Sequence, residues 1–193
     1  ASGSGTAALV FTYTIQGGDT DANGISIDTN SLALNSGTIS DAAGNAATLT
    51  FSAVADNSSY KVDTTAPTVS TVAITSATGI QNSTLNAGDV VSVTVTMSEA
   101  TTVTGTPQLA LNIGGTTVQA NYASGSGSTS LVFTYTIAAG QTDANGISIA
   151  ANALSLNSGT LTDAAGNESN ASSAFTIDTS GPAAPVLTNV TEL

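Results

Sequence analysis

The residues whose types and spacing could carry out chemistry are mainly acidic, and several of them lie in a repeated turn. The sequence Asp-Ala-Ala-Gly-Asn occurs at residues 41–45 and again at residues 163–167. An Asp-Thr step follows each copy, at Asp63 and at Asp178, and Glu99 follows a run of alternating Val residues. Carboxylate oxygens, amide oxygens and backbone carbonyls are the ligands that Ca²⁺ prefers. This set therefore predicts calcium chemistry.

The amino-acid composition argues against catalysis. The chain has no His and no Cys, and Lys61 is its single basic residue. The usual general bases and activated nucleophiles are therefore missing. Paired carboxylates can hydrolyse glycosides, but these acids lie in repeated turns, and an aromatic content of 4% offers little surface for stacking sugars. We expect the protein not to be an enzyme.

The charge balance limits the partners. With 13 acidic residues and a net charge of −12, the chain cannot neutralise phosphates, so we expect no nucleic-acid binding and no attraction to an anionic membrane. No apolar run approaches the ~20 residues of a membrane helix, so no insertion is expected. An acidic, Cys-free composition suits a secreted bacterial protein with divalent counter-ions. Its acidity could equally serve solubility alone.

Internal repetition dominates the sequence. Residues 1–45 align without a gap with residues 123–167, at an offset of 122, and 33 of the 45 positions are identical. Beyond the acidic turn, Pro67 aligns with Pro182 at an offset of 115, so the first copy is longer by 122 − 115 = 7 residues. One module is about 115 residues, which suits an immunoglobulin-like sandwich of about 100 residues.

These offsets predict three segments. Residues 1–62 are the C-terminal half of one repeat, residues 63–178 are a complete repeat, and residues 179–193 are a linker and the first strand of a following one. A half repeat cannot close a core formed by two sheets. Strands from elsewhere would have to complete it.

Alternating apolar residues predict the strands of the complete repeat. Val91, Val93, Val95 and Met97 share one face of a strand, and Gly114-Gly115 joins two strands into a hairpin. The fold class predicted is all-β, a tandem array of Greek-key sandwiches. The expected strands are 68–75, 90–97, 107–113, 117–122, 130–137, 147–156 and 174–177, with a turn at 163–167.

Such a sandwich would bring separate acids together. Its N-terminal entry, one loop after the second strand and the loop before the last strand share a pole, and these hold Asp63, Glu99, and Asp163 with Asn167. Three carboxylates ~5 Å apart would repel by roughly 3 kcal/mol per pair at an effective dielectric constant of 20. A cation would convert this repulsion into stabilisation. The other pole holds Asp143, whose counterpart in the preceding repeat is Asp21, and a second metal site could recruit them.

A purely structural role remains open for each acid. Asp in Asp-Ala-Ala-Gly-Asn can accept backbone hydrogen bonds while Gly supplies a positive φ. For the Asp-Ala-Asn-Gly segments at 21–24 and 143–146, a turn is the favoured prediction. Without Asp63 and Glu99, Asp163 would be only part of a turn.

Ser98-Glu99, the Asp-Ala-Ala-Gly-Asn turn and the linker Asp63-Thr64-Thr65-Ala66-Pro67 together resemble the bacterial immunoglobulin-like repeats of giant, type I-secreted (RTX-type) adhesins. The resemblance implies an extracellular, cell-surface stalk that supports cell adhesion or biofilm formation, with calcium stiffening the junctions between adjacent repeats. It carries the metal role to Asp63, Glu99 and Asp163, and to Asp41 and Asp178 as their counterparts. The linker at 181–185 departs from the pattern. The alternative function is an extracellular filament subunit, assembled from neighbouring copies by strand complementation.

Overall fold

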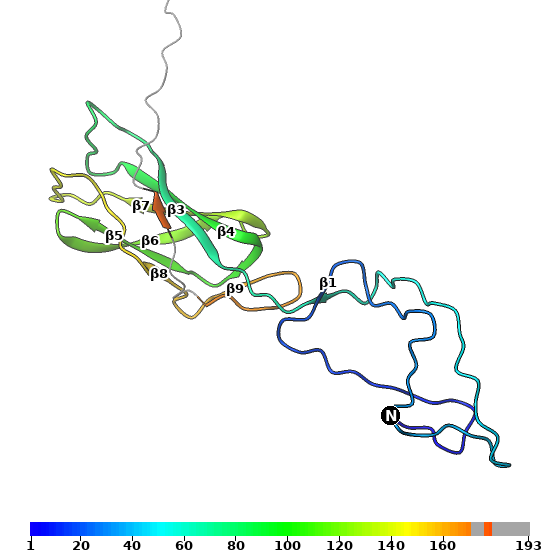
Figure 1. Ribbon diagram of the computed structural model, residues 1–193. Coiled ribbons are helices and arrows are strands. Elements are labelled where there is room, and N and C mark those ends of the chain that lie inside the picture. Colours follow the sequence, from blue (N-terminus) through cyan, green and yellow to red (C-terminus); the bar gives the residue numbers. More distant parts are fainter. Residues whose placement is uncertain (171–175, 179–193) are drawn as a thin grey trace, which may run out of the picture. The chain divides into compact units, whose positions relative to one another are not determined.

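The computed structural model describes residues 1–170 and 176–178 (Figure 1). Over these residues the protein is all-β, with antiparallel, curled sheets and no helix. The fold-class prediction is therefore confirmed at the level of an all-β protein. No membrane-spanning helix is found in the part of the chain described. The chain divides into two units, Ala1–Thr65 (unit 1) and Ala66–Leu193 (unit 2).

Unit 2 is organised around a strongly paired sheet of eight strands. Its order is β10-β3-β4-β7-β6-β5-β8, and β9 pairs with β4 outside this path. Every pairing is antiparallel except that of β10 with β3. The strands are β3 (Val69–Ala77), β4 (Val90–Thr104), β5 (Gln108–Ile113), β6 (Thr116–Ser124), β7 (Ser128–Thr136), β8 (Leu154–Ser155), β9 (Thr160–Thr162) and β10 (Thr176–Asp178).

Alternation along β4 and β7 builds the core. Successive side chains of a strand point to opposite faces, so Val93 of β4 and Phe133 of β7, which are paired in register, both turn inward and are fully buried. Tyr122 of β6 meets Phe133 edge to face, with ring centroids 5.8 Å apart. The other buried apolar residues are Val69, Val72, Val91, Val95, Met97, Leu109, Leu111, Ile113, Ala120, Leu131, Ile137, Ile149, Leu154 and Leu161.

The hairpin formed by β5 and β6 has the predicted turn. Gly114 and Gly115 both have positive φ, at 56° and 86°, the conformation that a tight two-residue hairpin requires. Ile113 pairs with Thr116 across it. A Cβ on Gly114 would lie 1.9 Å from the carbonyl oxygen of Thr142. The turn is therefore seated directly on the segment at residues 142–143.

Two features of unit 2 differ from the expected strands. β4 does not end at Met97 but continues through Glu99 to Thr104, with a register irregularity between Thr96 and Thr101. It continues because its last three residues gain β9 as a new partner. The strand expected at 147–156 is reduced to the bridge between Asn112 and Ser148 and to the two residues of β8.

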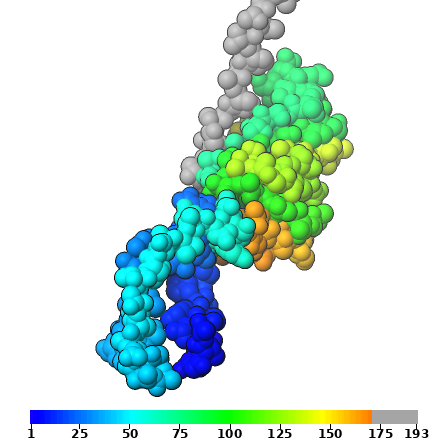
Figure 2. All heavy atoms as spheres, turned by 90° about the vertical axis from the view of Figure 1, so that its right-hand side faces the viewer, coloured from blue at the N-terminus to red at the C-terminus, as the bar shows by residue number. Residues whose placement is uncertain are grey.

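Unit 1 contains little regular pairing. Its strands β1 (Thr20–Asp21) and β2 (Val62–Asp63) have two residues each and pair antiparallel. The other described pairings in it are single bridges, such as Ile27 with Val54. In Figure 2 open space remains between the dark-blue and cyan runs of this unit, whereas the green-to-yellow part of unit 2 is filled.

Candidate metal centre

The turn at residues 163–167 is held by Asp163 itself. One oxygen of its carboxylate, Oδ1, accepts the backbone N–H of Asn167 at 2.8 Å, and Oδ2 accepts the side-chain amide of Asn167 at 2.7 Å. Gly166 has a φ of 92°, which residues with a Cβ rarely adopt. Asp163 is 5% exposed. The sequence thus fixes a nearly buried carboxylate in one orientation.

Glu99 lies within β4 rather than in a loop. β4 pairs with β7 up to Thr96 and again at Thr101, on either side of Glu99, and it pairs with β9 from Thr102 onwards. Thr101, which is completely buried, donates a hydrogen bond from its hydroxyl to the carbonyl oxygen of Glu99 at 3.0 Å. Sequence reasoning missed this contact, because an isolated Thr in a Thr-rich chain gives no signal.

The pairing of β9 with β4 brings Asp163 towards Glu99. Thr102 is the register partner of Thr162, so Asp163 follows directly beyond the pair on the side of the strand that carries Glu99. The close approach behind this pairing depends on Gly159, because a Cβ there would lie 2.3 Å from the carbonyl oxygen of Thr104. The short strand β9 is therefore what positions the second carboxylate.

The segment that enters β3 is fastened beside Glu99. Ser98 donates its backbone N–H to the carbonyl oxygen of Thr68 at 2.8 Å, and its hydroxyl accepts the N–H of Thr68 at 2.9 Å. Pro67 is fully buried. Asp63 lies four residues before Pro67, and its Oδ1 accepts the N–H of Thr65 at 2.9 Å.

Asp63, Glu99 and Asp163 form one acidic cluster. Each offers a carboxylate oxygen, and these oxygens all lie within 4.8 Å of one another. Unit charges ~4.8 Å apart repel by roughly 3 kcal/mol per pair at an effective dielectric constant of 20. Their burial is graded, since Asp63 is exposed, Glu99 is half-buried and Asp163 is buried. The cluster can hold a metal ion.

The donor set fits a hard cation. Calcium binds oxygens at about 2.3–2.6 Å, so two ligands on opposite sides of one ion are about 4.8 Å apart. All three carboxylates can therefore contact the same ion. Soft metals are disfavoured, because the chain has no Cys and no His.

Hydrogen bonding keeps Asp163 in its charged form. Burial of its carboxylate acts to raise its pKa, but hydrogen bonds from the Asn167 side chain and from the backbone N–H groups of Asn167, Gly166 and Ala165 outweigh this, and its pKa lies below the usual value. Hydrogen bonds to a carboxylate favour ionisation. A charged carboxylate is the form that binds a cation.

Of the remaining predicted ligands, Asn167 contacts the cluster and Asp41 lies outside it. Asn167 directs its amide N–H to Asp163, so its described role is to orient that carboxylate. Asp41 makes the same turn in unit 1, with hydrogen bonds from the Asn45 side chain and backbone that lower its pKa. Asp178 ends β10, opposite Ala73 of β3. Among the described residues Asp41 does not join the cluster, and the side chain of Asp178 lies outside the part of the chain that is described.

Asp21 and Asp143 serve as matched turn residues. Oδ1 of Asp143 accepts the N–H groups of Asn145 and Gly146, each at 3.0 Å. Oδ1 of Asp21 accepts those of Asn23 and Gly24, at 3.1 and 2.8 Å. Within the described residues neither Asp joins a group of three acids.

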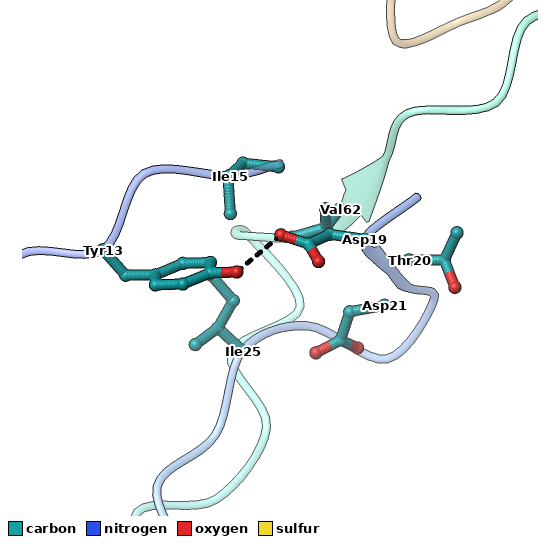
Figure 3. A pocket seen from close by; sticks show the side chains of 7 residues that line it. All are labelled: Tyr13, Ile15, Asp19, Thr20, Asp21, Ile25 and Val62. Atoms are coloured by element: carbon teal, nitrogen blue, oxygen red, sulfur yellow. Dashed lines mark hydrogen bonds between the residues drawn. The ribbon is translucent and has the colours of Figure 1, made fainter. Parts of the chain in front are cut away.

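Unit 1 also contains an open pocket of about 270 Å³ (Figure 3). The hydroxyl of Tyr13 donates a hydrogen bond to Asp19 Oδ2 at 2.9 Å across it, and this bond raises the pKa of Tyr13. The lining is part apolar and part acidic, and it consists of Tyr13, Ile15, Asp19, Thr20, Asp21, Ile25 and Val62. This pocket was not predicted from the sequence, because its residues belong to an ordinary strand-and-turn pattern.

Comparison of the chain with protein-family models, with curated proteins and with solved structures found no match.

Proposed function

We propose that this chain is a structural extender of a bacterial cell-surface adhesin, built from tandem immunoglobulin-like repeats and stiffened by calcium at the junctions between repeats. It acts outside the cell in adhesion or biofilm formation and has no catalytic role. The observation that carries the proposal is the acidic cluster of Asp63, Glu99 and Asp163. Two of these residues come from turn and linker motifs that recur along the chain.

The position of the cluster along the chain supports a junction role. Asp63 precedes the first strand of unit 2 by six residues, whereas Glu99 and Asp163 belong to the body of that unit. A shared ion would therefore tie the connecting segment to the repeat that follows it. Because each repeat contributes the same motifs, the arrangement can recur along an array, and the resemblance to adhesin repeats rests on the same residues.

Calcium titration of the full chain tests the metal role. Extracellular calcium modules bind at about 10⁻⁴ to 10⁻³ M, so calcium at ten times the Kd should stabilise unit 2 by about 1.4 kcal/mol. This corresponds to a rise in Tm of roughly 5 °C, measured against EDTA. Small-angle scattering tests the mechanical role, since calcium should narrow the distribution of end-to-end distances.

A matched pair of variants makes the test specific. Glu99→Gln keeps the shape of the side chain and removes one charge of the cluster, so the calcium response should fall at least about tenfold in affinity. Glu168→Gln removes one charge from an exposed residue outside the cluster and should leave the response intact. Equal behaviour of the two variants, or a Tm unaffected by EDTA, would contradict the calcium proposal.

A further inference from the structure

Unit 1 exposes the residues that unit 2 buries. Phe11 is 61% exposed, whereas Phe133, the same residue of the repeat 122 positions later, is 0% exposed. Leu9 and Ile15 are 42% and 43% exposed, while Leu131 and Ile137 are at 0% and 7%. These pairs lie in an identical stretch of seven residues, 9–15 and 131–137. The difference therefore comes from the surroundings and not from the sequence.

The structure of unit 2 shows what covers these positions. Leu131 and Phe133 pair in register with Val95 and Val93 of β4, and Phe133 also pairs with Tyr122 of β6. The whole covering segment, residues 66–122, supplies β3, β4, β5 and nearly all of β6. Unit 1 keeps the last trace of this pairing, because the bridge between Ser2 and Val10 matches the pair Ser124 and Val132.

The pocket of unit 1 is lined by residues whose equivalents in unit 2 contact the hairpin turn at Gly114. There, Oδ2 of Asp143 accepts the N–H of Gly114 at 2.9 Å, and Gly114 has no room for a Cβ against Thr142. The equivalent residues in unit 1, Thr20 and Asp21, line the open pocket in Figure 3. Among the described residues, Asp21 Oδ2 accepts no such hydrogen bond.

The framework around this pocket is already formed. Tyr13 bonds to Asp19 as Tyr135 bonds to Gln141 at the matching positions. Asp21 holds its turn with the same N–H pattern as Asp143. A preformed site with an uncovered apolar face is the arrangement expected of a surface that takes up missing strands.

We propose that the exposed apolar face of unit 1, centred on Leu9, Phe11 and Ile15, is a docking surface for a strand segment of the same type as residues 66–122. The occupant is a copy of this segment additional to the one in the chain. Residues 66–122 already fill the core of unit 2, so exchanging them onto unit 1 would uncover residues 131–149 and bring no net burial. The hairpin turn of the occupant would fill the pocket beside Tyr13 and donate its N–H to Asp21.

The test adds an unlabelled polypeptide with the sequence of residues 66–122 to the isotope-labelled full chain, in EDTA. Amides of residues 6–15 and 25–27 should exchange with solvent at least about tenfold more slowly, at a stoichiometry of one to one. Resonances of unit 2 should stay in place. Unchanged exchange in unit 1, or displacement of residues 66–122 from unit 2, would overturn the proposal.

A second form of the experiment guards against aggregation of the added polypeptide. Joining the 66–122 sequence directly ahead of Ala1 reproduces the natural junction between Tyr122 and Ala123, because residues 1–5 and 123–127 are identical. In the extended chain the amides of Phe11 and Tyr13 should be protected from exchange. Unit 1 should then unfold in a cooperative transition. An extended chain in which residues 6–15 remain unprotected would overturn the proposal irrespective of solubility.

Matched variants locate the surface. Phe11→Asp places a charge where Phe133 is buried in unit 2 and should abolish protection. Thr14→Asp places the same charge in the same segment, at a position whose counterpart, Thr136, is exposed, and should have no effect. Equal protection in both variants would contradict the proposed face. Since all measurements are made without calcium, their outcome is independent of the metal cluster.

Discussion

The two units show what one sequence does with and without its neighbouring strands. Residues 131–137 form most of β7 and pack in a closed core, whereas the identical residues 9–15 are exposed and belong to no strand. The β-propensity of this stretch is the same in both places. Its regular structure therefore depends on cross-strand partners, in agreement with the general finding that strand preference is largely side-chain packing.

The turns behave differently from the strands. Asp163 and Asp41 make the same pattern of hydrogen bonds to Asn167 and Asn45, although one is buried and the other exposed. Asp143 and Asp21 also hold matching turns. Local hydrogen bonds between an Asp side chain and the backbone need only a few residues, so they form in both units. The turns are local features, and the sheet is not.

The largest effect should separate Phe133 from Phe11. Phe133→Ala removes a fully buried aromatic ring from the core and should destabilise unit 2 by about 3–5 kcal/mol. Phe11→Ala changes an exposed side chain and should leave the unfolding transition of unit 2 unchanged. Urea denaturation followed by NMR signals of unit 2 measures both. Equal destabilisation by the two variants would mean that unit 1 is also packed.

A smaller effect should separate Asp163 from Asp41. Asp163→Asn keeps one oxygen that can accept the backbone N–H of Asn167, loses the acceptor for the Asn167 side-chain amide, and removes one charge of the acidic cluster, so the calcium-dependent stabilisation of about 1–2 kcal/mol should disappear. Asp41→Asn makes the same exchange in unit 1, outside the cluster. Thermal unfolding with calcium and with EDTA gives the comparison. A full calcium response in Asp163→Asn would remove this residue from the site.

The smallest effect concerns acid. The N–H of Gly114, with those of Asn145 and Gly146, holds the pKa of Asp143 below the usual value of 3.8. A folded pKa below the unfolded one means that the stabilisation is present above about pH 3.8 and is lost as pH falls through the folded pKa. Asp143→Asn should therefore reduce the pH dependence of the free energy of unfolding of unit 2 below pH 4. Asp21→Asn, which lacks a hairpin contact, should not change it.

The sequence predicted the parts of unit 2 whose pattern is local. Alternation placed Val91, Val93, Val95 and Met97 on one buried face, and Gly114-Gly115 indicated the hairpin; both predictions are confirmed. The sandwich arrangement also suggested that Asp63, Glu99 and Asp163 share a pole, and their carboxylates do lie close together. The repeated motifs singled out these residues as candidates, and the general topology of a sandwich predicted that they lie close together.

The features that were missed depend on distant partners. The alternation of Val residues ends at Met97, so the continuation of β4 past Glu99 could not be read from it; β9 supports that continuation from residues 160–162. The parallel pairing of β10 with β3 likewise depends on residues about 100 positions apart. The predicted strand at 174–177 is described only from Thr176, and the predicted segment 179–193 lies outside the described residues.

The placement of residues 66–122 between two nearly identical segments has a consequence for the order of synthesis. At about 5–20 residues per second, the ribosome needs about 2–8 s to add the 161 − 122 = 39 residues that complete the core of unit 2, whose last member is Leu161. Throughout that interval the newly made β3–β6 segment has residues 1–45 as a matching partner already translated. A filled surface on unit 1 removes this competitor, so completion of each repeat protects the folding of the next.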